Sequence, residues 1–158
     1  MKRRNFIKSV MAVSAATVVP MSLMAKEEAA KAKKKGPNDM TFDAAVAAIS
    51  GGKEVKVSDK IKLTVPEIAE NGAVVPAKVN VDHPMEENNY VKAIHVLSTK
   101  NGNVRCADVM LTPMNAKGYF ATRIKLGGTQ EVVAIAALSD GSFIKAAKSV
   151  KVTIGGCG

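Results

Sequence analysis

Hydrophobic positions change their spacing once along the chain, close to residue 51. Before that point they recur every three to four residues, as on one face of a helix, at Phe42, Ala45, Val46 and Ile49. Asp39 or Thr41 can cap the start of this helix, and Gly51 with Gly52 can end it. The pattern therefore predicts one short helix over residues 41–50.

After residue 52, apolar and polar residues alternate with the two-residue period of a half-buried β-strand. Turn signals rich in Gly, Pro and Asn separate the alternating stretches, and the strongest of them is Asn71-Gly72. The expected strands cover residues 61–65, 75–81, 90–97, 104–111, 119–126, 130–138 and 142–154. About seven or eight short strands with almost no helix predict an all-β protein, an immunoglobulin-like antiparallel β-sandwich with a short N-terminal helix.

One segment, residues 131–138, is apolar on both faces of its predicted strand. A strand of this kind lies in the middle of a sheet, or another protein covers one of its faces. The sequence leaves both explanations open.

The first 25 residues have the pattern of a removable export signal. Four cations open the chain, a stretch without charge runs from Ser9 to Met24, and Ala25 is a small residue suited to cleavage. The stretch is too short and too rich in Ala and Ser for a membrane span. Paired arginines followed by Phe6 and Lys8 favour the twin-arginine route, which carries folded proteins. We therefore expect residues 1–25 to direct the protein to the periplasm; an ordinary secretory signal, or cleavage after Ala30 or Ala32, are the alternatives.

Charge adds little to this assignment. Removal of the signal takes away four of the cations that give the chain its net charge of +9, which leaves +5. Residues 26–40 contain five lysines and are predicted to form a flexible basic linker, and residues 41–154 are predicted to form one domain. With two Tyr, four Phe and no Trp, the chain lacks aromatic platforms for base stacking, so we expect no nucleic-acid partner.

Signatures of enzymes and metal sites are missing from the expected domain. His83 and His95 lie in different elements, and each is expected to be structural. A soft metal site could be assembled from Cys106 and methionine side chains, but ordinary packing of these residues is the expectation; the methionines concerned are Met40, Met85, Met110 and Met114. We therefore predict no catalytic residue, no metal ligand and no cofactor.

Two cysteines remain. In an oxidising compartment a Cys106–Cys157 disulfide is the default reading. Cys157, however, stands in Gly155-Gly156-Cys157-Gly158, where glycines remove steric hindrance and allow an extended arm of about 14 Å. A carboxylate on Gly158 would disfavour the reactive thiolate of Cys157. This thiol is therefore predicted to be a handle that an enzyme activates.

The ending Gly-Gly-Cys-Gly resembles that of the SoxY family, the sulfur carriers of bacterial thiosulfate oxidation, whose chains usually end in Gly-Gly-Cys-Gly-Gly. Further segments in the same order carry the resemblance: Glu70-Asn71-Gly72 with Val75-Pro76, Val81 to Met85, Tyr90 to His95, Thr122 to Leu126, and Leu138 to Ser142. Two features depart from the family pattern, namely the missing final glycine and the second cysteine, Cys106.

The resemblance implies that Cys157 is the covalent attachment site for sulfur, on a swinging arm of Gly155, Gly156 and Gly158. It implies a β-sandwich partner subunit, SoxZ, and a chain that is a substrate and not an enzyme. The transient partners it implies are a SoxAX-type haem enzyme that conjugates thiosulfate, a SoxB-type hydrolase that releases sulfate, and a sulfane dehydrogenase. The alternative from another class is a periplasmic interaction module closed by a Cys106–Cys157 disulfide.

Overall fold

The predicted helix is confirmed in the computed structural model, which describes residues 39–156. α1 spans Phe42–Ser50, and the Thr41 hydroxyl accepts a hydrogen bond from the Ala44 N–H at 3.3 Å. Gly51, at φ 61°, provides the left-handed C-cap that a residue without Cβ adopts most easily. Of the two candidate N-caps, the structure thus selects Thr41.

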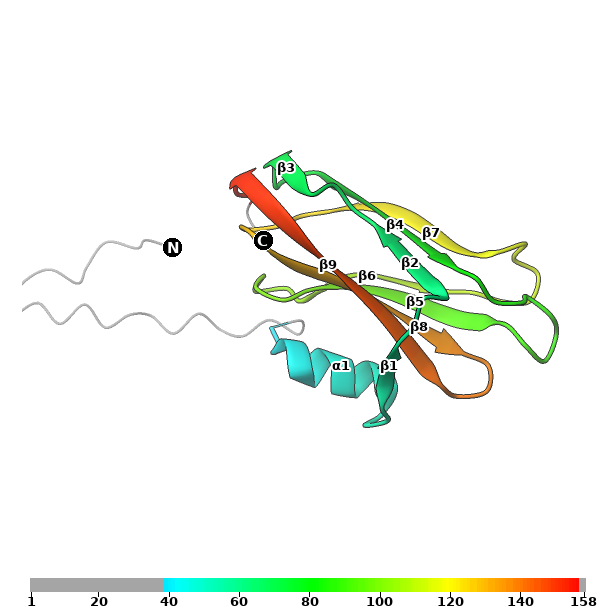
Figure 1. The fold of residues 1–158 in the computed structure, drawn as a ribbon. Helices are drawn as coiled ribbons and strands as arrows, with labels where there is room; N and C mark the ends of the chain where they lie inside the picture. Colours follow the sequence, from blue (N-terminus) through cyan, green and yellow to red (C-terminus); the bar gives the residue numbers. More distant parts are fainter. Residues whose placement is uncertain (1–38, 157–158) are drawn as a thin grey trace, which may run out of the picture. The chain divides into compact units, whose positions relative to one another are not determined.

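Two sheets pack face to face beside this helix (Figure 1). The larger sheet has the order β1-β9-β8-β5-β6, with β3 also paired to β9, and the smaller sheet has the order β2-β4-β7. The larger sheet contains β1 Val55–Val57, β3 Ile68–Asn71, β5 Val91–Ser98, β6 Arg105–Met110, β8 Gln130–Leu138 and β9 Phe143–Ile154. The smaller sheet contains β2 Ile61–Thr64, β4 Val75–Val81 and β7 Gly118–Ile124.

The immunoglobulin-like all-β sandwich is therefore confirmed, with nine strands among the described residues in place of seven or eight. The two strands that the sequence did not predict, β1 and β3, have three and four residues and pair parallel with opposite ends of β9. Such short edge strands bury few side chains, so they lack a clear hydrophobic alternation. All other strand pairs are antiparallel.

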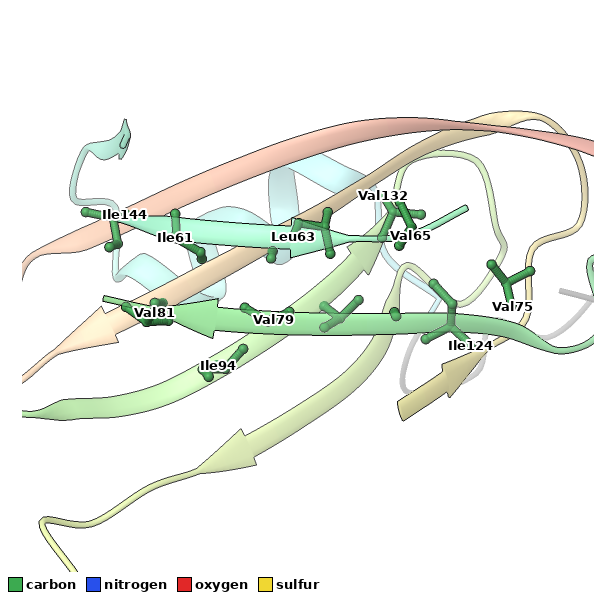
Figure 2. Close-up of a cluster of buried hydrophobic side chains, with 14 of the residues drawn as sticks. Ile61, Leu63, Val65, Val75, Val79, Val81, Ile94, Ile124, Val132 and Ile144 are labelled. Carbon is green, nitrogen blue, oxygen red and sulfur yellow. The ribbon is translucent and has the colours of Figure 1, made fainter. Parts of the chain in front are cut away.

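The main core lies between the sheets. In β4 every second residue is buried, and Val75 and Val79 are fully enclosed. Figure 2 shows these side chains together with Ile94 of β5 and Val132 of β8, which reach the core from the other sheet. Period-two alternation in the sequence thus corresponds to one face of each sheet turned inward.

A smaller second core explains why residues 131–138 are apolar on both faces. On the face away from the main core, Val133 and Ile135 of β8 pack with Leu97 of β5 and Ala45 of α1. β8 lies between β5 and β9, so the prediction of a central strand is confirmed. Because α1 covers the second face, this segment no longer argues for a partner protein.

The domain begins slightly earlier than expected. Asp39 forms an isolated bridge with Asn103, and Met40 packs against the second core. These two residues of the expected 26–40 linker therefore belong to the fold. The expected export signal and the rest of the linker lie outside the described residues. Within residues 39–156, no helix is long and apolar enough to cross a membrane.

Candidate functional site: the base of the C-terminal arm

The predicted arm leaves the domain at the end of β9. β9 ends at Ile154, and the structure describes the next two residues, Gly155 and Gly156. Cys157, the predicted sulfur attachment site, and Gly158, the last residue of the predicted arm, lie outside the described residues. The site is therefore built from the residues that hold the arm up to Gly156.

Three backbone hydrogen bonds connect the end of β9, two turns of the domain and the arm. The Gly72 N–H donates to the Ile154 carbonyl at 2.7 Å, and the Leu126 N–H donates to the Gly72 carbonyl at 2.7 Å. The Gly156 N–H then donates to the Leu126 carbonyl at 3.0 Å. Ile154, Gly72, Leu126 and Gly156 thus form one continuous hydrogen-bonded series at the root of the arm.

The glycines at this point are packed too closely to carry a side chain. A Cβ on Gly72 would lie 2.2 Å from the Leu126 carbonyl oxygen and 2.8 Å from the Gly156 nitrogen. A Cβ on Gly156 would lie 2.6 Å from the Ala73 nitrogen, and one on Gly155 would lie 2.5 Å from the Gly127 carbonyl oxygen. Real Cβ atoms essentially never approach backbone this closely. Glycine is needed here because the backbones approach one another closely.

This packing changes the expected length of the free arm. The sequence predicts a flexible arm from Gly155 onward, because glycine lowers conformational restriction. In the structure, neighbouring backbone holds Gly155 and Gly156, so the arm is held as far as Gly156, and Cys157 and Gly158 follow in the sequence. At roughly 3.5 Å per residue, the reach beyond Gly156 is about 7 Å while this contact persists.

Sequence reasoning missed the part that Gly72 plays here. Asn71-Gly72 was expected to form a turn, and it does: the Asn71 side-chain oxygen accepts from the Ala73 N–H at 2.8 Å. Nothing in the local sequence indicates that this turn meets a segment more than 80 residues later. The one available signal was a glycine in the Glu70-Asn71-Gly72 segment that carries the family resemblance.

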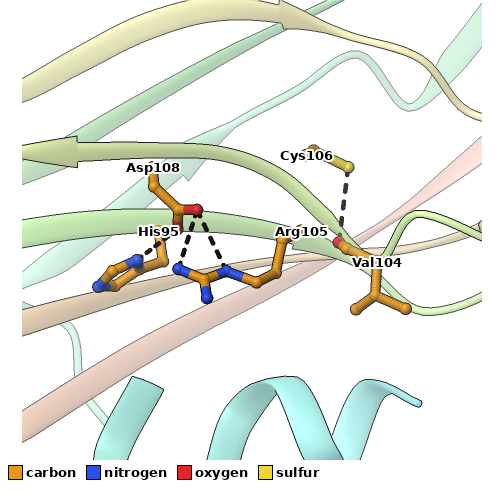
Figure 3. Close-up of polar contacts among 5 residues, drawn as sticks. All are labelled: His95, Val104, Arg105, Cys106 and Asp108. Atoms are coloured by element: carbon orange, nitrogen blue, oxygen red, sulfur yellow. Dashed lines mark hydrogen bonds and ion pairs between the residues drawn. The ribbon is translucent and has the colours of Figure 1, made fainter. Parts of the chain in front are cut away.

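Cys106, the other cysteine, is a free thiol in β6 and is half-buried. Burial raises the pKa of the Cys106 thiol, and nearby Asp108 adds to the rise, while a hydrogen bond with Ser98 opposes it. Its sulfur also lies 3.7 Å from the Val104 carbonyl oxygen (Figure 3). A thiol with a raised pKa is mostly protonated at neutral pH and is a weak nucleophile.

His95 is buried and forms part of a polar cluster on β5 and β6. Its Nδ1 lies 2.5 Å from one carboxylate oxygen of Asp108, and Arg105 binds the other oxygen at 2.9 and 3.1 Å (Figure 3). Burial alone would raise the pKa of Asp108, but the hydrogen bonds from His95 and Arg105 outweigh it and hold the pKa below its usual value. The three side chains satisfy one another.

The remaining candidate ligands do not converge within the described part of the chain. His83 has a buried Nε2 without a hydrogen-bond partner. Met110 and Met114 are 72% and 93% exposed, while Met40 and Met85 pack against the two cores. Among residues 39–156, no group of three or more His, Cys, Asp or Glu side chains is placed to hold a metal ion.

Comparison with solved structures relates the fold to two kinds of protein. The sulfur carrier protein SoxY from Chlorobium limicola f. thiosulfatophilum is 30% identical at a TM-score of 0.62, and the match covers 72% of this chain and 97% of that one. A superoxide reductase (neelaredoxin) from Ignicoccus hospitalis is 24% identical at a TM-score of 0.54, covering 76% and 99%. At that identity, the second likeness concerns the fold alone.

No curated protein matches the chain. Comparison of the sequence with protein families gives a more specific result than the fold. Residues 46–157 match the family described as "Sulfur oxidation protein SoxY", and this match includes Cys157 as well as the turn at Gly72. The matched range covers more than half of the chain, so the protein belongs to the SoxY family.

Proposed function

We propose that this sulfur carrier holds sulfur intermediates covalently on Cys157 and presents them to partner enzymes in the periplasm. The observation that carries the proposal is the position of the cysteine: it follows directly after a glycine pair at the edge of a rigid β-sandwich, and the family match extends to it. A thiol in this position can enter the active site of another protein while the domain stays outside. Holding an intermediate on a tether also keeps its local concentration high as successive partners act on it.

The loading step joins the Cys157 sulfur to the sulfane sulfur of thiosulfate. The thiol loses its proton, a sulfur–sulfur bond forms, and two electrons leave to a haem enzyme of the SoxAX type. Hydrolysis by a SoxB-type enzyme then cleaves the bond to the sulfonate with one water, which releases sulfate and leaves a sulfur-extended cysteine. A sulfane dehydrogenase oxidises the remaining sulfur. In this scheme the chain is a substrate of its partners and catalyses nothing itself.

Export and pairing complete the proposal. The twin-arginine pattern of the first 25 residues supports delivery to the periplasm, together with a SoxZ-like β-sandwich subunit. Replacing Arg3 and Arg4 by lysine is expected to retain the protein in the cytoplasm, as fractionation would show. Periplasmic delivery of that variant at the normal rate would contradict the twin-arginine route.

The carrier function is tested by intact-mass analysis. After incubation with thiosulfate and the conjugating enzyme, we expect an adduct on the wild-type chain that a reductant removes. Cys157→Ala should lose the adduct completely, and Cys106→Ala, the matched control, should keep it. An adduct on Cys106, or none on either cysteine, would contradict the proposal.

The same samples address the disulfide alternative. Two free thiols in the native mature protein, or one thiol and an adduct, support the carrier. A stable Cys106–Cys157 bridge would favour a structural module instead. In the structure the Cys106 sulfur is a free thiol directed at the Val104 carbonyl.

A further inference from the structure

The contacts at the root of the arm form a narrow slot with two walls. One wall is the turn Gly72-Ala73, and the other is the turn Leu126-Gly127; Gly156 lies between them. We call this feature the arm slot. The Gly156 backbone is held on the Leu126 side by its hydrogen bond and on the Gly72 side by close van der Waals contact.

Hydrogen bonds from side chains of the domain hold both walls. The Asn71 carboxamide oxygen accepts from the Ala73 N–H at 2.8 Å and holds the first turn. Asn101 holds the second: its amide donates to the Lys125 carbonyl at 2.6 Å, and its oxygen accepts from the Gly127 N–H at 3.0 Å. The slot is therefore preformed by the domain, whereas the described part of the arm, Gly155 and Gly156, is attached to it by one hydrogen bond, from the Gly156 N–H.

We propose that Gly72 is a positioning residue of the carrier: its missing side chain keeps the arm slot open, so that the arm docks there between encounters with partner enzymes. This inference rests on the function proposed above for Cys157. One net hydrogen bond corresponds to a population ratio of about two to thirteen. The docked arm therefore dominates, and the released arm is sampled often.

Docking and delivery compete for the same arm. While Gly156 is docked, Cys157 extends no more than about 7 Å past the slot; after release, the arm gains the two residues that the slot held, and its reach doubles to about 14 Å. A partner with a deep active site captures the released form alone. Its apparent affinity is reduced by the fraction of arms that are released. The slot keeps the thiol near the domain surface without blocking delivery.

The test compares Gly72→Ala with Gly128→Ala, a control in the loop after Leu126-Gly127, where an added Cβ meets no atom within 4 Å. The first measurement is amide hydrogen exchange by NMR on the full mature chain. We expect the Gly156 amide to be protected about three- to fourteenfold in the wild type and in Gly128→Ala, and unprotected in Gly72→Ala. Core amides such as that of Ile94 should be equally protected in all three proteins.

A second variant covers the case in which Gly72→Ala does not fold. Gly156→Ala places the clash on the arm itself, at 2.6 Å from the Ala73 nitrogen, so the arm leaves the slot while the domain is unchanged. It should lose the same protection at residue 156. Protection that persists in both variants, or an unprotected Gly156 in the wild type, would refute the slot whatever Cys157 carries.

The functional measurement is steady-state loading of Cys157 by the conjugating enzyme. Releasing the arm in Gly72→Ala should lower the KM for the carrier about three- to fourteenfold and leave kcat unchanged. A merely structural defect would instead lower the fraction of active carrier. An unchanged or raised KM, with protection of Gly156 lost, would show that docking does not compete with delivery. If Cys157 takes up no sulfur at all, the proposed function fails while the exchange result still decides the slot.

Discussion

Asn101 offers the sharpest test of how the domain holds the base of the arm. Its half-buried side chain joins three segments: it donates to the Lys125 carbonyl, and its oxygen accepts from the Gly127 N–H and from the buried Gln130 amide at 2.7 Å. Asn101→Ala removes all three hydrogen bonds. We expect a smaller loss for Asn101→Asp, which keeps the accepting oxygen and loses the donor to Lys125.

The expected magnitude follows from these contacts. Each net hydrogen bond contributes about 0.5–1.5 kcal/mol, but two of the three are exposed to solvent, so the free energy of unfolding should fall by about 1–3 kcal/mol in Asn101→Ala. A domain of about 120 residues unfolds with an entropy near 0.25 kcal/mol/K, so the Tm should drop by about 4–12 °C. Thermal unfolding followed by circular dichroism measures this shift.

The same variant should also loosen the arm, because Asn101 orients the Leu126 carbonyl that accepts from Gly156. Faster exchange of the Gly156 amide is therefore expected at temperatures well below the transition. Asn88→Ala, at an exposed position, is the matched control and should shift the Tm by less than about 2 °C. A drop in Asn101→Ala no larger than in this control would refute the role of Asn101.

Three further outcomes are expected. At pH 7 an alkylating reagent should modify Cys157 before Cys106, because burial raises the pKa of the Cys106 thiol. Peptide mass mapping measures the order of modification, and the reverse order would contradict this prediction. Asp108→Asn should destabilise the domain at pH 7. Because the folded pKa of Asp108 lies below its unfolded value near 3.9, its contribution is full above that value and is lost as the pH falls through the folded pKa; a Tm difference that grows toward pH 2 would contradict this sign. Ile135→Ala should lower the free energy of unfolding, measured by chemical denaturation, by about 2–5 kcal/mol because Ile135 is fully buried under α1. Val57→Ala, at a 79% exposed position, should lower it by less than about 0.5 kcal/mol. Equal losses in the two variants would refute the second core.

Local sequence was sufficient where structure depends on neighbours in the chain. The helix was predictable because its cap, apolar face and terminating glycine lie within about ten residues. β4 was predictable because apolar residues that become buried alternate with exposed residues along the strand. The apolar segment in β8 indicated a central strand, but not that α1 would cover its second face, since that depends on where the helix packs.

The sequence also predicted a role for the terminal glycines and Cys157, because no other part of the chain combines a thiol with unhindered neighbours. Only the tertiary structure decided how the arm begins. Gly72 and Leu126 meet Gly156 through backbone atoms, and backbone contacts between distant segments leave no hydrophobic pattern to read. The parallel pairing of β1 and β3 with β9 is hidden for the same reason: it depends on which strand edge is free once the sandwich has assembled. The sequence thus predicted which residue carries the chemistry, and the fold determined where the base of its arm is held.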